Sequence, residues 1–295
     1  MQCCPELEER GRILVVPRRQ GSKAPISDTT NSFFVNRDQE ISKFSDKFRS
    51  YVVEIDKFAV RAWLSQFRGE HRELGLKLLG NVDYYSPGRV MNGTRVLHEQ
   101  LMAIKGGKID RTLFASMALS PGSGADMLLP AYRVANRLKK KTWDSYFIRL
   151  SELGNFFEQK DVTFAFIDDF IGTGNHVITM WQNIGHLVPE DSEALLLVLT
   201  GYKEGIDAVE RNTRLEVVCN KVLSEENKVF SSSNPMFDEE EKRILKSYCE
   251  TAGSLPEGYG CMQSTVIFYY RAPNNTISIL RCISPSWKGL FPRNP

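Results

Sequence analysis

The sequence predicts an α/β fold in which a parallel sheet is flanked by helices. Between residues 108 and 252, short apolar stretches alternate with helical segments of about 10–15 residues. This alternation is typical of βαβ crossovers, which make neighbouring strands parallel. The expected strands are almost continuously apolar, as strands are when helices cover both faces of a sheet.

Changes in composition along the 295 residues divide the chain into four segments. Residues 1–35 are polar and rich in turn formers, which predicts a loose N-terminal arm. Residues 36–107 are expected to form a helical region, and residues 108–252 the α/β core. Residues 253–295 are rich in glycine, proline and aromatic residues and are expected to cap the core.

The individual elements follow from residue spacing. Apolar residues four positions apart in a charged background predict helices within 39–80 and over 89–105. Apolar runs predict strands at 112–119, 143–150, 162–167, 193–200 and 215–219. Helices are expected between them at 125–141, 176–187 and 203–211, with a kink or a late start at Pro130.

The C-terminal part adds a helix and a hairpin. Residues 237–252 form an amphipathic pattern with an acidic first turn, which suits the dipole of a helix. Two strand-like segments follow at 264–270 and 276–283. Ala-Pro-Asn-Asn lies between them and predicts a turn, with Asn274 and Asn275 in left-handed conformations.

Charge and composition exclude several classes of protein. A balance of 38 basic against 36 acidic residues gives no strong electrostatic footprint for nucleic acid. The longest apolar stretch, 194–199, falls far short of the ~20 residues needed to cross a bilayer. The N-terminus lacks a secretory pattern, and the six cysteines form no C-x-x-C pair. We therefore expect a cytoplasmic protein with reduced thiols.

The segment 164–175, FAFIDDFIGTGN, carries the clearest chemistry. An apolar strand ends in two carboxylates, Asp168 and Asp169, and a Gly-Thr-Gly turn leads into a helix. Glycines let backbone N–H groups surround an anion, and a helix start adds further donors. Both acids can serve one ligand only if the strand ends at Asp168, because successive strand side chains point oppositely. The alternative is a pair of solvated loop acids, with Thr173 or Asn175 capping the helix.

The whole string resembles the phosphoribosyl pyrophosphate (PRPP) binding motif of type I phosphoribosyltransferases. The resemblance implies that Asp168 and Asp169 are the catalytic acids and take the ribose hydroxyls. It assigns the 5′-phosphate loop to Phe170, Ile171, Gly172, Thr173 and Gly174. Family members often carry threonine or serine at the position of Gly172, so one hydroxyl donor is missing here.

A second glycine-rich turn lies between a strand and a helix, about 45 residues upstream. By the same resemblance it is the pyrophosphate loop, formed by Ser120, Pro121, Gly122, Ser123 and Gly124. Both turns would then lie at the carboxyl ends of parallel strands, where open α/β sheets bind ligands. The alternative is an ordinary helix entry with a serine cap.

The terminal segments narrow the resemblance. PEGYGCMQSTVIFYYRAPNNTISIL and WKGLFPR, with WLSQF and LGLKLLGNVDYYS within 63–86, resemble phosphoribosyltransferase-like proteins of bacterial conflict systems. That group includes retron effectors, encoded beside reverse transcriptases. The resemblance implies a hood-like C-terminal segment and an anti-phage effector, or toxin, that binds PRPP or a related nucleotide. Mg²⁺ would be held mostly by the substrate, with Asp168 and Asp169 contributing.

The same resemblance implies partners. We expect a controlling protein or ribonucleoprotein, such as a reverse transcriptase with its DNA product (ncDNA), and an oligomer. Only residues 151–161 separate two expected strands, which is too short for the mobile lid of metabolic phosphoribosyltransferases. Transfer, hydrolysis or rearrangement of a phosphoribosyl compound therefore stays open beside a non-catalytic module that senses the ligand and controls assembly.

Weaker candidates complete the site. Arg133 and Arg149 could bind pyrophosphate, although such charges usually lie on solvated faces. His176 directly follows the phosphate loop, and a lone histidine there is more often a bystander.

The tail aromatics Tyr259, Trp287 and Phe291 could stack on a base, but core packing is the commoner role for such residues. A serine hydrolase using Ser123, Asp168 and His176 is disfavoured, since Pro121 and Ala125 replace the glycines of a nucleophile elbow.

Overall fold

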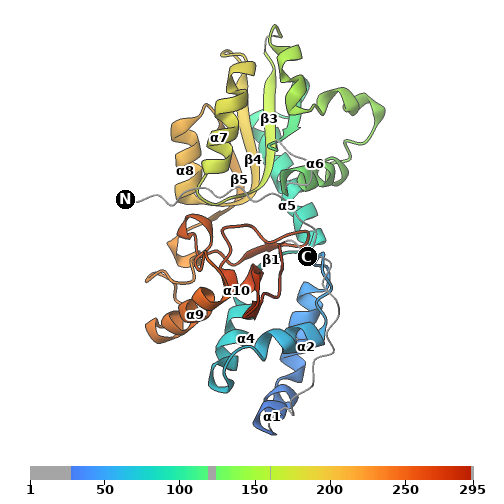
Figure 1. Ribbon diagram of the computed structural model, residues 1–295. Helices are drawn as coiled ribbons and strands as arrows, with labels where there is room; N and C mark the ends of the chain where they lie inside the picture. Colours follow the sequence, from blue (N-terminus) through green and yellow to red (C-terminus); the bar gives the residue numbers. More distant parts are fainter. Residues whose placement is uncertain (1–27, 119–123, 160, 294–295) are drawn as a thin grey trace.

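The computed structural model describes residues 28–118, 124–159 and 161–293, with the backbone alone for 28–31. These residues form two lobes, drawn one above the other in Figure 1. The upper lobe holds a parallel sheet with its helices. The lower lobe combines the N-terminal helices with the C-terminal segment. No helix in these ranges combines the length and apolar character needed to cross a membrane.

The sheet of the upper lobe has four parallel strands in the order β2-β3-β4-β5. Their bounds are β2 Thr112–Ser116, β3 Thr163–Ile171, β4 Glu193–Tyr202 and β5 Glu216–Leu223. Leu113 and Ala194 flank Phe164 in the register, so β3 is paired on both sides. Strands that follow one another in the chain are thus neighbours in the sheet.

Helices cover both faces of this sheet, which confirms the predicted fold class (Figure 1). The helices of the upper lobe are α5 Pro87–Ile104, α6 Gly124–Ala135, α7 Asn175–Ile184 and α8 Lys203–Asn212. Along β4, Leu195, Leu197 and Leu199 pack toward α5 and α6. Leu196 and Val198 pack toward α7 and α8. All five side chains are fully buried, which explains the continuous apolar run of the strand.

The lower lobe joins the two ends of the described chain. Its helices are α1 Asp28–Asn36, α2 Asp38–Phe48, α3 Lys57–Leu64, α4 Arg72–Gly80, α9 Glu239–Ala252 and α10 Ser278–Arg281. Trp287 and Phe291 are buried here, and their rings meet those of Trp63 and Phe48 edge to face. The two C-terminal aromatic residues are therefore core, as the commoner alternative held.

Two small sheets tie the C-terminal segment down. β1 (Asp83–Tyr85) pairs in parallel with β6 (Val266–Phe268), and β7 (Ile283–Ser284) pairs antiparallel with β8 (Trp287–Lys288). Short 3₁₀ helices occupy Gly69–His71, Lys141–Tyr146, Leu150–Phe156, Gly185–Leu187, Glu225–Asn227 and Tyr259–Cys261. The β1–β6 pairing brings the C-terminal segment close to the start of α5.

Packing crosses the predicted segment boundaries. α5, from the region expected to be helical, covers the sheet, while α9 packs beside the N-terminal helices. The four-segment division remains a prediction. The helix at Pro130 begins early, at Gly124, and continues through the proline, so the expected late start is wrong.

The strand predicted at 143–150 is also wrong. Its residues form parts of two 3₁₀ helices, and only Phe147 makes an isolated bridge, to Phe114. Trp143 and Tyr146 both pack toward the α5–α6 side, which is the three-residue spacing of a helical turn rather than the alternation of a strand. The sheet therefore has four strands in the described part of the chain.

The C-terminal hairpin is wrong for a different reason. β6 takes β1 as its partner, so the second segment is left to form α10 and only Ser264 and Thr276 form a bridge. Neither Asn274 nor Asn275 has a positive φ. The Asn275 side chain instead donates a hydrogen bond to the carbonyl of Tyr259, 2.9 Å away.

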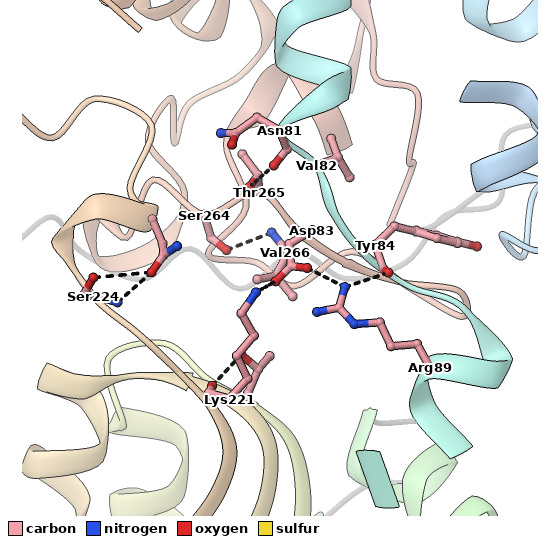
Figure 2. A network of polar contacts seen from close by, with 12 residues as sticks. Asn81, Val82, Asp83, Tyr84, Arg89, Lys221, Ser224, Ser264, Thr265 and Val266 are labelled. Atoms are coloured by element: carbon pink, nitrogen blue, oxygen red, sulfur yellow. Dashed lines mark hydrogen bonds and ion pairs between the residues drawn. The ribbon is translucent and has the colours of Figure 1, made fainter. Parts of the chain in front are cut away.

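A polar network joins the two lobes at β1 (Figure 2). The Asp83 carboxylate accepts hydrogen bonds from Arg89 of α5 and from Lys221 of β5, the latter at 2.8 Å. Arg89 also donates to the Tyr84 carbonyl. Burial raises the pKa of Asp83, but the two cations more than offset this effect, so its pKa lies below the usual range.

Asp83→Asn tests this junction. Because the pKa of Asp83 is lowered on folding, its contribution is present above the unfolded-state pKa and is lost as the pH falls through the folded-state pKa. Both cations are over one third exposed, so we expect a modest loss, about 1–2 kcal/mol at neutral pH. Chemical denaturation measures it, with the exposed Asp110→Asn as control. Equal stability of the two variants would contradict the role.

Candidate functional site

A cavity of about 370 Å³ lies at the carboxyl end of β3, between the sheet and the C-terminal segment. Four parts of the chain line it: the start of α6, the end of β3 with its following loop, the first turn of α7, and residues between 259 and 293. In Figure 1 the C-terminal segment runs beneath this edge of the sheet. The position is the one that parallel α/β sheets use for ligands.

The adjacent acids Asp168 and Asp169 both line this cavity. The strand does not end at Asp168, because β3 continues to Ile171. The register instead skips Asp169, pairing Asp168 with Val198 and Phe170 with Thr200. The Asp169 N–H donates to Oδ1 of Asp168 at 2.8 Å. Asp169 therefore makes no ladder pair with β4, and both carboxylates line the same cavity.

Burial governs the protonation of the acid pair. Asp168 is 5% and Asp169 9% exposed. Burial, followed by the charge of Asp169, raises the pKa of Asp168 well above its usual range. Burial also raises the pKa of Asp169, although Arg271 and the Tyr270 hydroxyl act in the opposite direction. We infer that the pair retains a proton at a pH where an isolated carboxyl has lost it, and that Asp168 carries it.

Tyr270 and Arg271 bring the C-terminal segment to the acids. The Tyr270 hydroxyl donates a hydrogen bond to Oδ2 of Asp169 at 3.0 Å. Burial raises the pKa of Tyr270 far above its usual range, so the phenol stays protonated and remains a donor. A hydroxyl therefore already occupies an oxygen of Asp169, as a sugar hydroxyl would.

The Gly-Thr-Gly turn lies directly beside the acids and leads into α7. Gly174 has a φ of 81° and stands at the N-cap of that helix, a conformation that favours glycine. The Thr173 hydroxyl accepts a hydrogen bond from the Asn175 N–H at 3.4 Å. The turn thus has the form expected of an anion-binding helix entry. The N-cap of α7 is Gly174, so neither Thr173 nor Asn175 is the N-cap that the alternative proposed.

The C-terminal segment presses closely on this turn. A Cβ on Gly172 would lie 2.4 Å from Nδ2 of Asn275, and a Cβ on Gly260 would lie 2.3 Å from the methyl carbon of Thr173. The absence of threonine or serine at Gly172 therefore has a steric explanation, since Asn275 occupies that space.

The side chains of the other two residues of the predicted phosphate loop pack on opposite faces of the sheet. Phe170 packs on the α5–α6 side of the sheet, and Ile171 is buried on the opposite side. His176 is exposed at the edge of the cavity, with its Nε2 3.4 Å from the Met117 carbonyl.

The second predicted loop is described only in part. Ser120, Pro121, Gly122 and Ser123 lie outside the described residues, and so does the nucleophile of the serine hydrolase alternative. Gly124 is the first residue of α6 and lines the cavity. A Cβ on it would lie 1.9 Å from Oδ2 of Asp169, so the backbone of this helix start packs against the acid pair.

The two weaker arginine candidates lie away from the cavity. Arg133 forms an ion pair with Asp144 at 2.6 Å and stacks over the ring of Phe147. Arg149 is exposed where the second 3₁₀ helix begins. Neither is among the residues that line the cavity.

Other residues stand in the cavity that sequence reasoning missed. Arg271 and Arg293 line it, and so does Asn275. Asn275 was predicted to be a turn residue, but its side chain lies against Gly172 and donates a hydrogen bond to the Tyr259 carbonyl. Tyr259, considered above as a stacking residue, lines it too and is 42% exposed. The one feature of the sequence that could have drawn attention to Arg271 is the Tyr-Tyr-Arg sequence before Ala-Pro-Asn-Asn. Nothing in that sequence indicates that these side chains lie beside Asp168 and Asp169.

The acid pair has the chemistry to share a magnesium ion with a ligand. In the ranges that the structure describes, no three His, Cys, Asp or Glu side chains gather in a way that could hold a metal. Mg²⁺ usually takes one or two carboxylates and completes its shell with water and substrate phosphates. Asp168 and Asp169 fit that limited role.

Comparison with known proteins identifies the family. The sequence model of a family described as PRTase-CE, where PRTase abbreviates phosphoribosyltransferase, matches residues 60–293. No curated protein matches the chain.

Two solved structures show weaker similarity, each at 14% identity. One, a hypoxanthine-guanine-xanthine phosphoribosyltransferase, is covered over 77% of its chain and 48% of this one, with a TM-score of 0.28. The other, orotate phosphoribosyltransferase from Aeropyrum pernix, is covered over 68% of its chain and 45% of this one, with a TM-score of 0.26. The assignment rests on the family match, which spans most of the sequence: the chain belongs to the PRTase-CE family and is a phosphoribosyltransferase-like protein.

Proposed function

We propose that the cavity binds PRPP or a related phosphoribosyl nucleotide and that the protein acts on it by phosphoribosyl transfer or hydrolysis. The observation that carries this proposal is that Asp168, Asp169 and the Gly-Thr-Gly turn line one cavity. Its volume of about 370 Å³ lies within the range of roughly 300–1,000 Å³ typical of small-ligand sites.

The proposed ligand makes two kinds of contact. Its 5′-phosphate lies at the turn 172–174, where backbone N–H groups and the start of α7 favour an anion. Its ribose hydroxyls donate to Asp168 and Asp169 and take over the hydrogen bond that Tyr270 makes to Asp169. Ribose binding therefore requires Tyr270 to yield or to share this oxygen.

Mg²⁺ belongs to the proposal as a substrate-bound ion. Asp168 and Asp169 would hold it together with phosphate oxygens of the ligand, and it would neutralise charge on a departing phosphate group. The carboxylates would also stabilise positive charge that develops on the pentose ring when the bond at its C1 breaks.

The biological role in the proposal comes from the resemblance of the terminal segments. It is that of an effector in bacterial anti-phage defence, controlled by a protein or ribonucleoprotein partner such as a retron reverse transcriptase. The family match over residues 60–293 supports the phosphoribosyltransferase-like part of this proposal.

A second candidate is a module that senses the same ligand without turnover. Before β3 the chain forms the 3₁₀ helix Leu150–Phe156, and this segment matches no long lid. Transfer to an acceptor benefits from a lid that excludes water, so this short segment favours hydrolysis or binding alone. Incubation with PRPP and Mg²⁺, followed by chromatography for ribose phosphates and pyrophosphate, separates the candidates: saturable binding without product would overturn the enzymatic proposal.

The double variant Asp168→Asn with Asp169→Asn tests the acids as ligands for ribose. We expect at least a tenfold loss of affinity for ribose 5-phosphate by calorimetry, because the variant removes the negative charge of the pair and leaves only neutral amide acceptors, and hydrogen bonds to a charged group contribute roughly 1.5–3 kcal/mol against about 1 kcal/mol for neutral ones. The matched control replaces the adjacent exposed acids, Glu190→Gln with Asp191→Asn. Similar affinity in the two double variants would contradict the assignment.

The raised pKa of Asp168 also predicts a pH dependence of stability. The folded protein holds this proton more tightly than the unfolded chain. The contribution of Asp168 is therefore fully present below the ordinary carboxyl pKa and is lost as the pH rises through the folded-state value. Asn keeps the oxygen that accepts from the Asp169 N–H but carries no charge. We expect Asp168→Asn to be more stable than the wild type at neutral pH, by about 2–4 °C for each kcal/mol of relief.

Thermal unfolding between pH 4 and 8 measures this effect. The advantage of Asp168→Asn should shrink as the pH falls, while Asp191→Asn should differ from the wild type by a constant amount. A variant less stable at neutral pH, or an advantage independent of pH, would show that burial of the acid pair is not the source of strain.

A further inference from the structure

Tyr270 lies in a tight turn that directly follows β6. Phe268 and Arg271 close this turn with two backbone hydrogen bonds of 3.0 Å, in which the N–H of each residue donates to the carbonyl of the other. Tyr269 and Tyr270 lie between them, and two residues are the commonest loop length of a β-hairpin. One short loop therefore presents two adjacent tyrosine side chains.

Tyr269 ties this turn to the lower lobe. The Val52 N–H donates to the Tyr269 carbonyl at 2.7 Å, and the Tyr269 N–H donates to the Tyr85 carbonyl at 2.9 Å. Val52 belongs to the loop between α2 and α3, and Tyr85 is the last residue of β1. Because both polar backbone groups of Tyr269 are bonded to segments outside the turn, the backbone of the turn is held in place.

The ring of Tyr270 is held by its aromatic neighbours. It stacks on Phe268 with the ring centroids 5.5 Å apart and an angle of 16° between the planes, and it meets Tyr269 edge to face at 4.9 Å. Aromatic pairs of this kind add stabilisation beyond the burial of their surface. The Tyr270 hydroxyl is therefore positioned on Oδ2 of Asp169 by a braced turn and a packed ring.

This hydroxyl occupies an acceptor that the proposed ligand also needs. Oδ1 of Asp168 already accepts a hydrogen bond from the Asp169 N–H, and Oδ2 of Asp169 accepts one from Tyr270. A Cβ on Gly124 would lie 1.9 Å from the same Oδ2, so the start of α6 closes another side of this oxygen. A sugar hydroxyl that binds Oδ2 must compete with the tyrosine for it.

We propose that the hydrogen bond from Tyr270 to Asp169 is an autoinhibitory contact. The tyrosine hydroxyl takes the place of a sugar hydroxyl and lowers the affinity of the cavity for a phosphorylated pentose. The inference rests on the proposed function and deepens it, because it states how the same site is regulated. The free protein holds the competing group in position, and release of the 268–271 turn increases the affinity.

The variant Tyr270→Phe tests this contact, because phenylalanine keeps the ring and removes only the hydroxyl. Calorimetry measures its affinity for ribose 5-phosphate, which brings hydroxyls to the acids, and for inorganic phosphate, which carries no sugar. We expect ribose 5-phosphate to bind roughly fivefold more tightly than to the wild type, as for one hydrogen bond that no longer competes. The affinity for inorganic phosphate should stay within about twofold of the wild-type value.

The matched control is Tyr269→Phe, which removes the neighbouring hydroxyl of the same turn and keeps the backbone hydrogen bonds of residue 269. We expect this variant to bind both ligands as the wild type does. An equal gain in affinity for ribose 5-phosphate in the control would overturn the inference, because the gain would then come from a looser turn.

Thermal unfolding separates an autoinhibitory contact from a purely structural one. Tyr270→Phe leaves Oδ2 of Asp169 without its donor, so we expect a lower melting temperature together with the tighter binding. A contact that only shapes the cavity would lose stability and affinity together, and that result would overturn the inference.

Two further outcomes decide between this inference and the proposed function. Unchanged affinity of Tyr270→Phe for ribose 5-phosphate, or an equal gain for ribose 5-phosphate and inorganic phosphate, would overturn the autoinhibitory contact alone. Failure of both the wild type and Tyr270→Phe to bind ribose 5-phosphate would instead overturn the proposed function.

Discussion

The burial of two adjacent carboxylates at the end of β3 is the constraint on which the rest of the site depends. Asp168 and Asp169 are removed from water side by side, which is unfavourable unless a proton, a hydrogen-bond donor or a cation compensates. The Tyr270 hydroxyl and the charge of Arg271 compensate Asp169, and the raised pKa of Asp168 favours a proton on the pair. An arrangement that is costly to fold and lies in a cavity is typical of a functional site.

The compensation comes from far along the chain, and this explains the architecture of the lower lobe. Tyr270 and Arg271 reach the acids because β6 pairs with β1 and because Trp287 and Phe291 are anchored among the N-terminal helices. The network around Asp83 connects the same region to β5. The lower lobe therefore holds the C-terminal segment against the phosphate turn, and the glycines at 172 and 260 permit that contact.

The parallel sheet, the acid pair and the glycine turn were predictable from the sequence, whereas the packing of the C-terminal segment over them was not. Apolar runs in the sequence predict the strands β2, β3, β4 and β5. The acids and the glycine turn lie at the end of the run that forms β3. The 143–150 segment is also rich in apolar residues, but its aromatic residues recur at helical spacing, and the predicted strand is therefore wrong. The predicted C-terminal hairpin is wrong because β6 pairs with β1, which lies about 180 residues earlier in the chain. Pairing between strands so far apart in the chain leaves no local pattern in the sequence. The position of Arg271 and Arg293 in the cavity depends on that pairing and could not be predicted either.

We propose that the acid pair and the Gly-Thr-Gly turn together hold a phosphorylated pentose. A crystal structure of the protein soaked with ribose 5-phosphate tests it most directly. We expect the phosphate to lie within hydrogen-bond distance of the backbone N–H groups of residues 172–174, and the sugar hydroxyls to contact Asp168 and Asp169. A sugar phosphate bound elsewhere, or a cavity in which Tyr270 keeps its hydrogen bond to Asp169 and excludes the ligand at saturating concentration, would contradict it.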